Sequence, residues 1–417
     1  MRRKVPVTQL AVGMYVQALD RPWLESPFMF QGFLIESLEQ VATLRQYCQY
    51  VFVDDEKAVV PGSKPSQERA SAQAGLAAST DTDERTSPPS DTTWRARRAF
   101  RQDVRRMLGS REKLHHHLAK VFQDVRFGRS IDTRESRVLV EEMVDTVAGS
   151  PATALWLTNL QSKHEYTASH CLNTCIFAIA FGVHLGLGKD SLAELGFGAL
   201  LHDVGKMRTP LSILDKPGVL TEDEFDIMKK HTIDGFNMLR KHKDVPQTAL
   251  EIVQLHHERI GGHGYPMGLK GDEIPQHVRI VAIADVYDDI TSNRIYHEGI
   301  PGHAGLNMMF HWAPRDFGEE LMQEFIRCVG IYPIGSLVEL NTGALGIVMS
   351  TNTASRLKPI VMLLRDRDGH AYERRPLLNL AAPAAQDSQF NWQIQRVVDC
   401  KEYGIDLGHV AEQEALI

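Results

Sequence analysis

The sequence predicts a mainly α protein with a small α+β module at its N-terminal end and a short β appendage near its C-terminal end. Three observations support this fold class. Apolar residues recur at helical spacing over most of 130–328, β-branched residues alternate over 336–366, and strand-like runs flank a short helical pattern within 5–54. A chain of 417 residues is also long enough for more than one domain.

Composition narrows the class of protein. Hydrophobic residues make up 43% and charged residues 24% of the chain, as in ordinary globular proteins. The net charge of −7 argues against a large nucleic acid as partner, although a local basic groove for a dinucleotide stays open. The five cysteines form no CxxC motif, which fits a reducing cytosol. The longest apolar run, 175–187, is too short to span a bilayer, so we expect a cytoplasmic protein without a membrane segment.

The first expected unit is an α+β module over residues 1–60. Its strands are expected at 5–7, 13–19 and 50–53, where β-branched and aromatic residues gather. Ser37 and Gln40 have the spacing of a capping box and predict a short helix to about Cys48. Residues 61–93 predict a flexible linker, because they contain too few large apolar side chains to offset the entropy of ordering them.

A helical domain is expected over residues 94–330, and its first helix, to about 126, is basic. A solvated face is the simplest interpretation of its arginines. His115, His116 and His117 point roughly 100° apart around a helix, so they cannot converge on one metal ion, and we expect them at the surface. Further helices are expected at 155–160, 172–187, 192–201, 275–292 and 319–328. Residues 331–417 are expected to form the β appendage and a tail.

His202 and Asp203 are the most informative residues of the helical domain. They end an apolar helical stretch, where unpaired polar groups are costly. A neutral imidazole nitrogen beside an anionic oxygen suits zinc, iron or manganese. Lys206 follows one turn later on the same helix face, and a cation there is better suited to an anionic substrate than to a metal. A metal with a lysine beside it indicates phosphate chemistry.

Five further histidine and aspartate residues are also candidate metal ligands. They are His170, His231, His256, His257 and Asp285. A single buried histidine is usually a hydrogen-bonded core residue, but this set brings the candidate ligands to seven. One metal ion has too few coordination positions for seven protein ligands, water and substrate. Two ions about 3.5–4 Å apart that share a carboxylate would use them all.

The order of these residues resembles the HD superfamily of metal-dependent phosphohydrolases, and within it the HD-GYP subfamily. His202-Asp203 with Gly205-Lys206 matches the HD signature, and Gly264-Tyr265-Pro266, after the stretch 256–259, matches the GYP motif. The stretches 213–218, 227–231 and 284–288 are similar too. This resemblance covers about residues 150–330. The aromatic run 20–32 resembles the N-terminal module that often precedes HD-GYP domains.

The resemblance implies an all-helical HD-type bundle and a bacterial second-messenger enzyme. The implied activity is metal-dependent hydrolysis of cyclic di-GMP to the linear dinucleotide pGpG, to GMP or to both. The implied cofactors are two divalent metal ions, with iron or manganese favoured because the ligand set has no thiolate. Two alternatives stay open: a catalytically weak module that binds cyclic di-GMP and relays the signal, and a phosphohydrolase of another cyclic dinucleotide.

Roles for single residues follow from the same resemblance. Asp203 is expected to bridge the metals, and Lys206 to contact a substrate phosphate or, alternatively, to serve as a structural partner of Asp203. Arg294 is expected to contact phosphate, and its plain interpretation is a surface arginine. The Gly264-Tyr265-Pro266 loop is either a structured loop near the site or a surface where Tyr265 positions substrate and GGDEF-type cyclases dock. A homodimer also stays open.

Four positions depart from patterns seen in the family. Gly261 stands where Asp is usual, His263 where a small residue is common, and His297 where Arg or Lys is usual. None of these removes a candidate ligand, so they bear on affinity and on the loop. Tyr166 stands four residues before His170, where trinuclear members carry Glu. A phenol with a pKa of about 10 is a poor ligand at neutral pH, so two metals are expected rather than three.

Overall fold

The computed structural model describes residues 2–19, 33–35, 41, 44–45, 48–54, 91–159, 166–218, 220–292, 299–352, 355–382 and 391–416. The chain divides into two compact units, Met1–Pro89 and Ser90–Ile417. No helix within the described ranges combines the length and the apolar character that a bilayer crossing requires.

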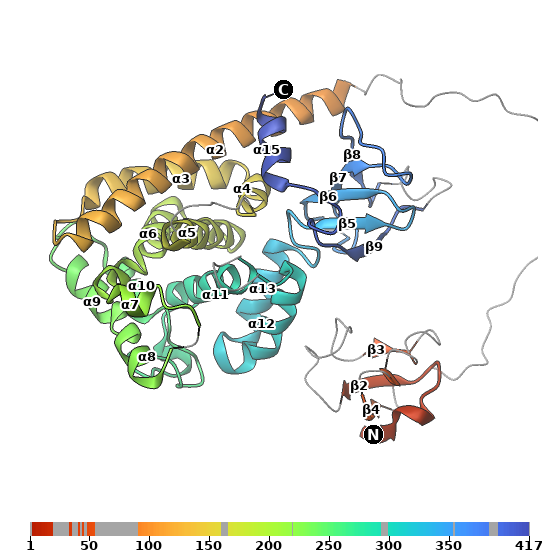
Figure 1. Cartoon of the computed structure of the whole chain (residues 1–417), viewed down its shortest axis with the longest axis horizontal. Coiled ribbons are helices and arrows are strands. Elements are labelled where there is room, and N and C mark those ends of the chain that lie inside the picture. The colour runs from red at the N-terminus through yellow and green to blue at the C-terminus, as the bar shows by residue number, and fades with distance from the viewer. Residues whose placement is uncertain are drawn as a thin grey trace, which may run out of the picture. The chain divides into compact units, whose positions relative to one another are not determined.

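The N-terminal unit contains a four-stranded antiparallel sheet (Figure 1). Its strands are β1 (Arg2–Pro6), β2 (Tyr15–Leu19), β3 (Phe33–Leu34) and β4 (Tyr50–Asp54), in the order β1-β4-β2-β3. Val5, Val16, Val51 and Val53 fill its small core. The strands predicted at 5–7, 13–19 and 50–53 are present with shifted ends. The aromatic run 20–32, most of the predicted helix 37–48 and residues 55–90, which include most of the predicted linker, lie outside the described residues.

The second unit is mainly helical, as predicted. In chain order, its helices begin with α2 (Asp91–Arg126), α3 (Thr133–Gly149), α4 (Pro151–Leu157), α5 (Tyr166–His184), α6 (Lys189–Leu201), α7 (Leu211–Leu214), α8 (Glu222–Lys229) and α9 (His231–Leu239). The later helices are α10 (Gln247–Leu255), α11 (Gln276–Thr291), α12 (Gly302–Asp316) and α13 (Glu319–Val329). Short 3₁₀ segments, η4 (Val204–Arg208) and η5 (Gly271–Glu273), connect some of them.

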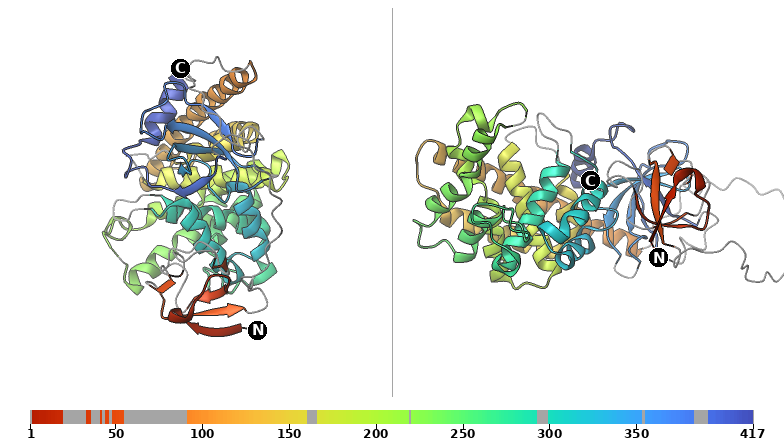
Figure 2. Two further views of the ribbon diagram at one scale, coloured as in Figure 1. Left: turned by 90° about the vertical axis from the view of Figure 1, so that its right-hand side faces the viewer. Right: turned by 90° about the horizontal axis from the view of Figure 1, so that it is seen from below.

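Helix α5 lies at the centre of this unit, between α2 and α3 on one side and α11 on the other (Figures 1 and 2). It also packs along α6. Cys171, Leu172, Cys175 and Phe181 on α5 are fully buried, so the two cysteines are core thiols as expected. Because α5 is enclosed, any polar side chain that it carries must find a partner inside the protein.

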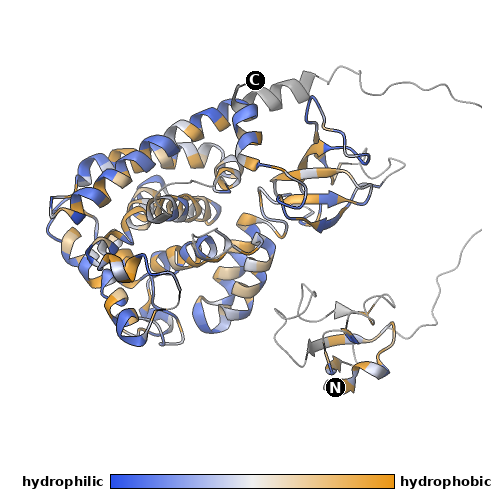
Figure 3. Ribbon diagram, viewed as in Figure 1, coloured by the Kyte–Doolittle hydropathy of each residue, from blue (hydrophilic) through white to orange (hydrophobic). Residues whose placement is uncertain are grey.

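Helix α2 begins at Asp91 rather than at 94 and packs against α3, α4 and α5. The prediction that all three histidines lie at the surface was wrong for His117, which is buried and bonds the Ser136 hydroxyl at 2.8 Å. His115 is half-buried and lies 3.2 Å from the Ser169 hydroxyl, whereas His116 is exposed. Helix α3 and the start of α5 cover this side of α2, which the sequence pattern alone did not indicate. Polar residues remain prominent along α2 (Figure 3).

The C-terminal appendage is a five-stranded antiparallel sheet, β8-β7-β6-β5-β9. Its strands are β5 (Leu337–Leu340), β6 (Leu345–Ser350), β7 (Ile360–Arg365), β8 (Leu377–Asn379) and β9 (Ile394–Val397). Ile347 and Met362 on one face join the helical core, so the sheet belongs to the same unit. Helix α15 (Leu407–Leu416), which the sequence did not predict, then packs against α2.

Candidate metal centre

His202 and Asp203 lie where α6 ends and η4 begins, and both are buried. His202 caps the C-terminus of α6, and its Nδ1 lies 2.7 Å from the Ala199 carbonyl oxygen. Nε2 of His202 and Oδ1 of Asp203 are buried without a hydrogen-bond partner in the described part of the chain. Buried polar atoms are rarely left in this state, and a metal ion would engage both of them.

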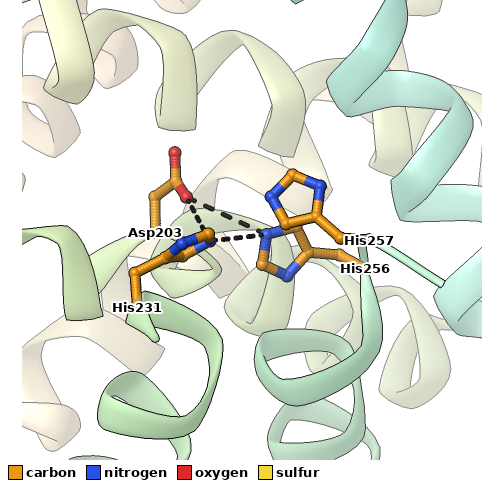
Figure 4. A group of neighbouring side chains, drawn as sticks. All are labelled: Asp203, His231, His256 and His257. Atoms are coloured by element: carbon orange, nitrogen blue, oxygen red, sulfur yellow. Dashed lines mark hydrogen bonds and ion pairs between the residues drawn. The ribbon is translucent and has the colours of Figure 1, made fainter. Parts of the chain in front are cut away.

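On one side of Asp203 lies a group of three histidines (Figure 4). His231 is the first residue of α9, and its Nε2 is 3.3 Å from Asp203 Oδ1. His256 and His257 follow the end of α10, and Nε2 of His256 lies 3.9 Å from the same oxygen and 3.4 Å from Nε2 of His231. The ligand atoms of Asp203, His231, His256 and His257 all lie within 4.8 Å of one another.

On the other side lies a second group, formed by His170, His202 and Asp285. Asp203 Oδ2 is 3.4 Å from Nε2 of His202 and 3.9 Å from Nε2 of His170. Asp285 Oδ1, from α11, is 3.0 Å from Nε2 of His170 and 3.5 Å from Nε2 of His202. The fold therefore brings all seven candidate ligands together, with one oxygen of Asp203 facing each group.

Backbone carbonyls fix the orientation of the rings. Nδ1 of His231 lies 2.7 Å from the Met228 oxygen, and Nδ1 of His256 lies 3.1 Å from the oxygens of both Ile252 and Val253. A carbonyl can only accept, so Nδ1 carries the proton and Nε2 keeps its lone pair towards the centre. Ligand atoms about 2.0–2.2 Å from one ion would be roughly 3–3.5 Å apart, which fits the shorter separations here.

The charge states of Asp203, His231, His256 and His257 fit a metal site directly. Burial raises the pKa of Asp203, but Lys206 and His202 outweigh it and hold that pKa well below its usual range. Burial lowers the pKa of His231 to about 4 and that of His256 and His257 well below the usual value. At neutral pH the carboxylate is therefore ionised and these three imidazoles are neutral, which are the forms that bind metal. Burial lowers the pKa of His170 and His202, but the carboxylates beside them outweigh it and raise both to about 9, so a metal bound there would displace a proton from each ring. Nitrogen and oxygen donors of this kind suit a divalent transition metal.

Lys206 lies on η4, so it reaches Asp203 through a 3₁₀ turn rather than along an α-helix. Its Nζ is 2.5 Å from Asp203 Oδ2, and 24% of its side chain is exposed. The two residues thus form an ion pair, and the Lys206 side chain is partly exposed. Contact with a phosphate stays a prediction.

Gly205 allows η4 to lie directly on the start of α9. A Cβ at this position would stand 1.9 Å from the His231 carbonyl oxygen and 2.7 Å from the Gly235 nitrogen. Both of these are backbone atoms, so they cannot move aside as the end of a side chain would. The glycine of the HD signature therefore sets the position of His231, which lies far along the chain.

Glu258 organises the loop that carries Tyr265. Its buried carboxylate accepts the backbone N–H groups of Met267 at 2.6 Å, Gly268 at 3.1 Å and Leu269 at 3.0 Å. The Tyr265 ring stacks on His257, with centroids 4.6 Å apart and planes at 27°. The sequence motif contained Glu258 but gave no role for it. The loop is therefore a packed structure against the ligand doublet.

Three residues near the centre were missed from the sequence. Asp288 Oδ2 lies 2.7 Å from Nδ1 of His170, Asn173 bonds Asp288, and Arg111 bonds Asn173. Asp288 follows Asp285 by three residues on the same helix, and this spacing could have identified it. Arg294 and His297 lie outside the described residues.

Three family models match the chain. A domain of unknown function (DUF3391) matches residues 2–136, an HD domain matches 158–320, and a KOW domain associated with HD domains matches 337–404. A cyclic di-GMP phosphodiesterase of Pseudomonas aeruginosa is 36% identical over 365 residues, which cover 87% of this chain and 84% of that protein.

Other similar proteins match a smaller part. A cyclic di-GMP phosphodiesterase of Thermotoga maritima is 40% identical over 34% of this chain and 39% of its own length. A 3′3′-cGAMP-specific phosphodiesterase of Vibrio cholerae is 34% identical over 44% of this chain and 33% of its own length. Among solved structures, an HDG"Y"P protein of Bdellovibrio bacteriovorus covers 78% of this chain and 98% of its own, with 15% identity and a TM-score of 0.45.

Proposed function

The chain belongs to the HD-GYP family of HD-domain phosphohydrolases, and on this premise we propose that it hydrolyses cyclic di-GMP at the centre around Asp203. The similarity to the Pseudomonas aeruginosa phosphodiesterase extends over most of both chains, which supports this substrate. The observation that carries the chemistry is the position of Asp203, whose two oxygens face two separate ligand groups.

We infer that this arrangement holds two divalent metals, iron or manganese, with Asp203 between them. His231, His256 and His257 would bind one ion, and His170, His202 and Asp285 the other. Such a pair lowers the pKa of a bound water and withdraws charge from a phosphoryl oxygen. The Nδ1–H bonds to backbone carbonyls hold the rings of His202, His231 and His256 in place, so the ligands need little reorganisation when metal binds.

Substrate contacts belong to the same proposal. With metal held by Asp203, the ammonium of Lys206 would be available to bind a non-bridging phosphate oxygen, where negative charge grows during in-line attack. Arg294 is proposed as a second phosphate contact. Tyr265 is proposed to position the substrate beside the ligand doublet, and its stacking on His257 supports this role. Cleavage of one phosphodiester bond gives pGpG, and cleavage of the second gives GMP. The Gly264-Tyr265-Pro266 loop, next to the exposed side chain of Met267, is the proposed docking surface for GGDEF-type cyclases.

The test of this function is turnover by protein purified without oxygen, with its metal content measured. Cyclic di-GMP and 3′3′-cGAMP are compared as substrates because phosphodiesterases named for each are similar to this chain. Faster turnover of cyclic di-GMP supports the proposal. Faster turnover of 3′3′-cGAMP reassigns the substrate, and tight binding of cyclic di-GMP without turnover by the metal-loaded protein identifies a signalling module instead.

The metal count is expected to be two per chain. Trinuclear members have a Glu where this chain has Tyr166, and a phenol with a pKa of about 10 binds metal poorly at neutral pH. Fewer cations would also hold the free 5′ phosphate of pGpG less firmly, so this product should accumulate before GMP appears. Elemental analysis and product chromatography measure both quantities. Three tightly bound metals, or GMP without transient pGpG, would contradict the prediction.

A further inference from the structure

Helix α2 lies outside the residues that match the HD domain, yet it packs against α5, which carries His170. All of α2 falls within residues 2–136, which match the domain of unknown function. On this helix Arg111 donates from Nη1 to Oδ1 of Asn173 at 2.9 Å. We propose that Arg111 is a positioning residue, which orients the proposed metal ligand His170 through Asn173 and Asp288.

The connection is a continuous chain of hydrogen bonds between three helices. Asn173 on α5 donates from Nδ2 to Asp288 Oδ1 at 3.0 Å. Asp288 on α11 accepts from Nδ1 of His170 through its other oxygen at 2.7 Å. The opposite nitrogen of that ring, Nε2, lies 3.0 Å from Asp285 in the centre. The orientation of the imidazole therefore depends on where Asp288 is held.

The donor and acceptor roles in this series of hydrogen bonds explain why an arginine is needed at the end away from His170. A guanidinium group can only donate, and a carboxylate can only accept. Between the two, the amide of Asn173 has one satisfied orientation, with its oxygen towards Arg111 and its nitrogen towards Asp288. Asn173 Nδ2 also donates to the Thr158 carbonyl oxygen at 3.4 Å. Without Arg111 the amide oxygen loses its donor, so the amide is less firmly oriented and its nitrogen holds Asp288 less well.

Burial and charge make the hydrogen bonds of Arg111, Asn173 and Asp288 costly to lose. Asp288 is 2% and Asn173 5% exposed, so water cannot easily replace a lost partner. Burial lowers the pKa of Arg111 to about 10, while Asp288 raises it, so the side chain stays charged at neutral pH. Ser292 also donates to Asp288 Oδ1 at 2.9 Å, so loss of the Asn173 bond should shift Asp288 without leaving its carboxylate unpaired. The expected defect is in ligand geometry.

The inference rests on the proposed metal centre, and Mn²⁺ affinity of the full-length protein tests it without any substrate. Arg111→Met should weaken binding at one Mn²⁺ site by about 10- to 100-fold. This is the usual effect of removing a residue whose hydrogen bonds orient a metal ligand. Arg111→Lys, which keeps a charged donor, should recover much of the affinity. Lys113→Met is the matched control, because Lys113 lies on the same helix as Arg111 and forms an exposed ion pair with Glu142 of α3. It should bind Mn²⁺ like the wild type.

A double-mutant cycle separates positioning from general damage and does not depend on Arg111→Met folding alone. Asn173→Ala removes the middle of the chain, and alanine is well tolerated in a helix. Asn173→Ala should lose as much Mn²⁺ affinity as Arg111→Met. The double variant should lose no more than either, because both changes break the same series of hydrogen bonds. Wild-type Mn²⁺ affinity in folded Asn173→Ala or Arg111→Met, or losses that add in the double variant, would overturn the proposal. Failure of the wild type to bind either Mn²⁺ or, without oxygen, Fe²⁺ would instead overturn the metal centre itself.

Discussion

Asp203→Asn is expected to lose tight metal binding and to abolish hydrolysis of cyclic di-GMP. The substitution keeps the shape of the side chain, but an amide offers one neutral oxygen where the carboxylate offers two charged ones to the two ligand groups. Removing a single transition-state donor typically costs about 100- to 1,000-fold in rate, and loss of the metals should cost more. Metal analysis and turnover measure the result.

Asp145→Asn is the matched control for this variant. Asp145 forms an exposed ion pair with Lys189, away from the described ligands, so the same chemical change there should leave metal content and turnover unaltered. Circular dichroism shows whether both variants fold. Full metal content and wild-type turnover in Asp203→Asn would refute the bridging role.

Lys206→Met is expected to keep both metals and to lose about 100- to 1,000-fold in kcat, or about 2.7–4 kcal/mol of transition-state stabilisation. Methionine retains the apolar stem and removes the ammonium group. Burial lowers the pKa of Lys206, but Asp203 outweighs it and raises that pKa, so the group is charged at neutral pH. The variant therefore removes a full positive charge, carried by a side chain that is 24% exposed.

The same variant separates the two interpretations of Lys206. A phosphate contact predicts lower kcat at unchanged metal affinity. A structural partner of Asp203 predicts altered metal affinity and a lower melting temperature, with turnover per bound metal kept. Lys189→Met, which removes an exposed lysine from its pair with Asp145, is the control for loss of charge.

The main architecture and the ligand candidates could be predicted because both leave local patterns. The apolar run that becomes α5 has helical spacing, and His202-Asp203 forms a compact motif after α6. Ligands must also be particular residue types, so Asp285 stood out in an apolar stretch, and His231 stood out in a stretch that resembles the family. The structure adds that all seven candidates meet around Asp203.

The residues that orient the proposed ligands through hydrogen bonds could not be predicted in this way. Arg111 looks like any arginine on a basic helix, and only the packing of α2 on α5 brings it to Asn173. His117 was misassigned for the same reason, because α3 covers a face that the sequence left open. For Lys206 the sequence motif was recognisable, but the sequence did not show that the residue lies in a 3₁₀ segment. Nor did it decide between a contact with Asp203 and one with phosphate, and the structure shows the ion pair with Asp203.

The close backbone contact at Gly205 has a consequence for judging which relatives remain active. A Cβ there would collide with the carbonyl of His231, so a single methyl group could displace a ligand without altering any ligand residue. A homologue could therefore retain every histidine and aspartate of the centre and still be a degenerate, non-hydrolysing member. In surveys of such sequences, loss of this glycine should count against catalysis as heavily as loss of His231 itself.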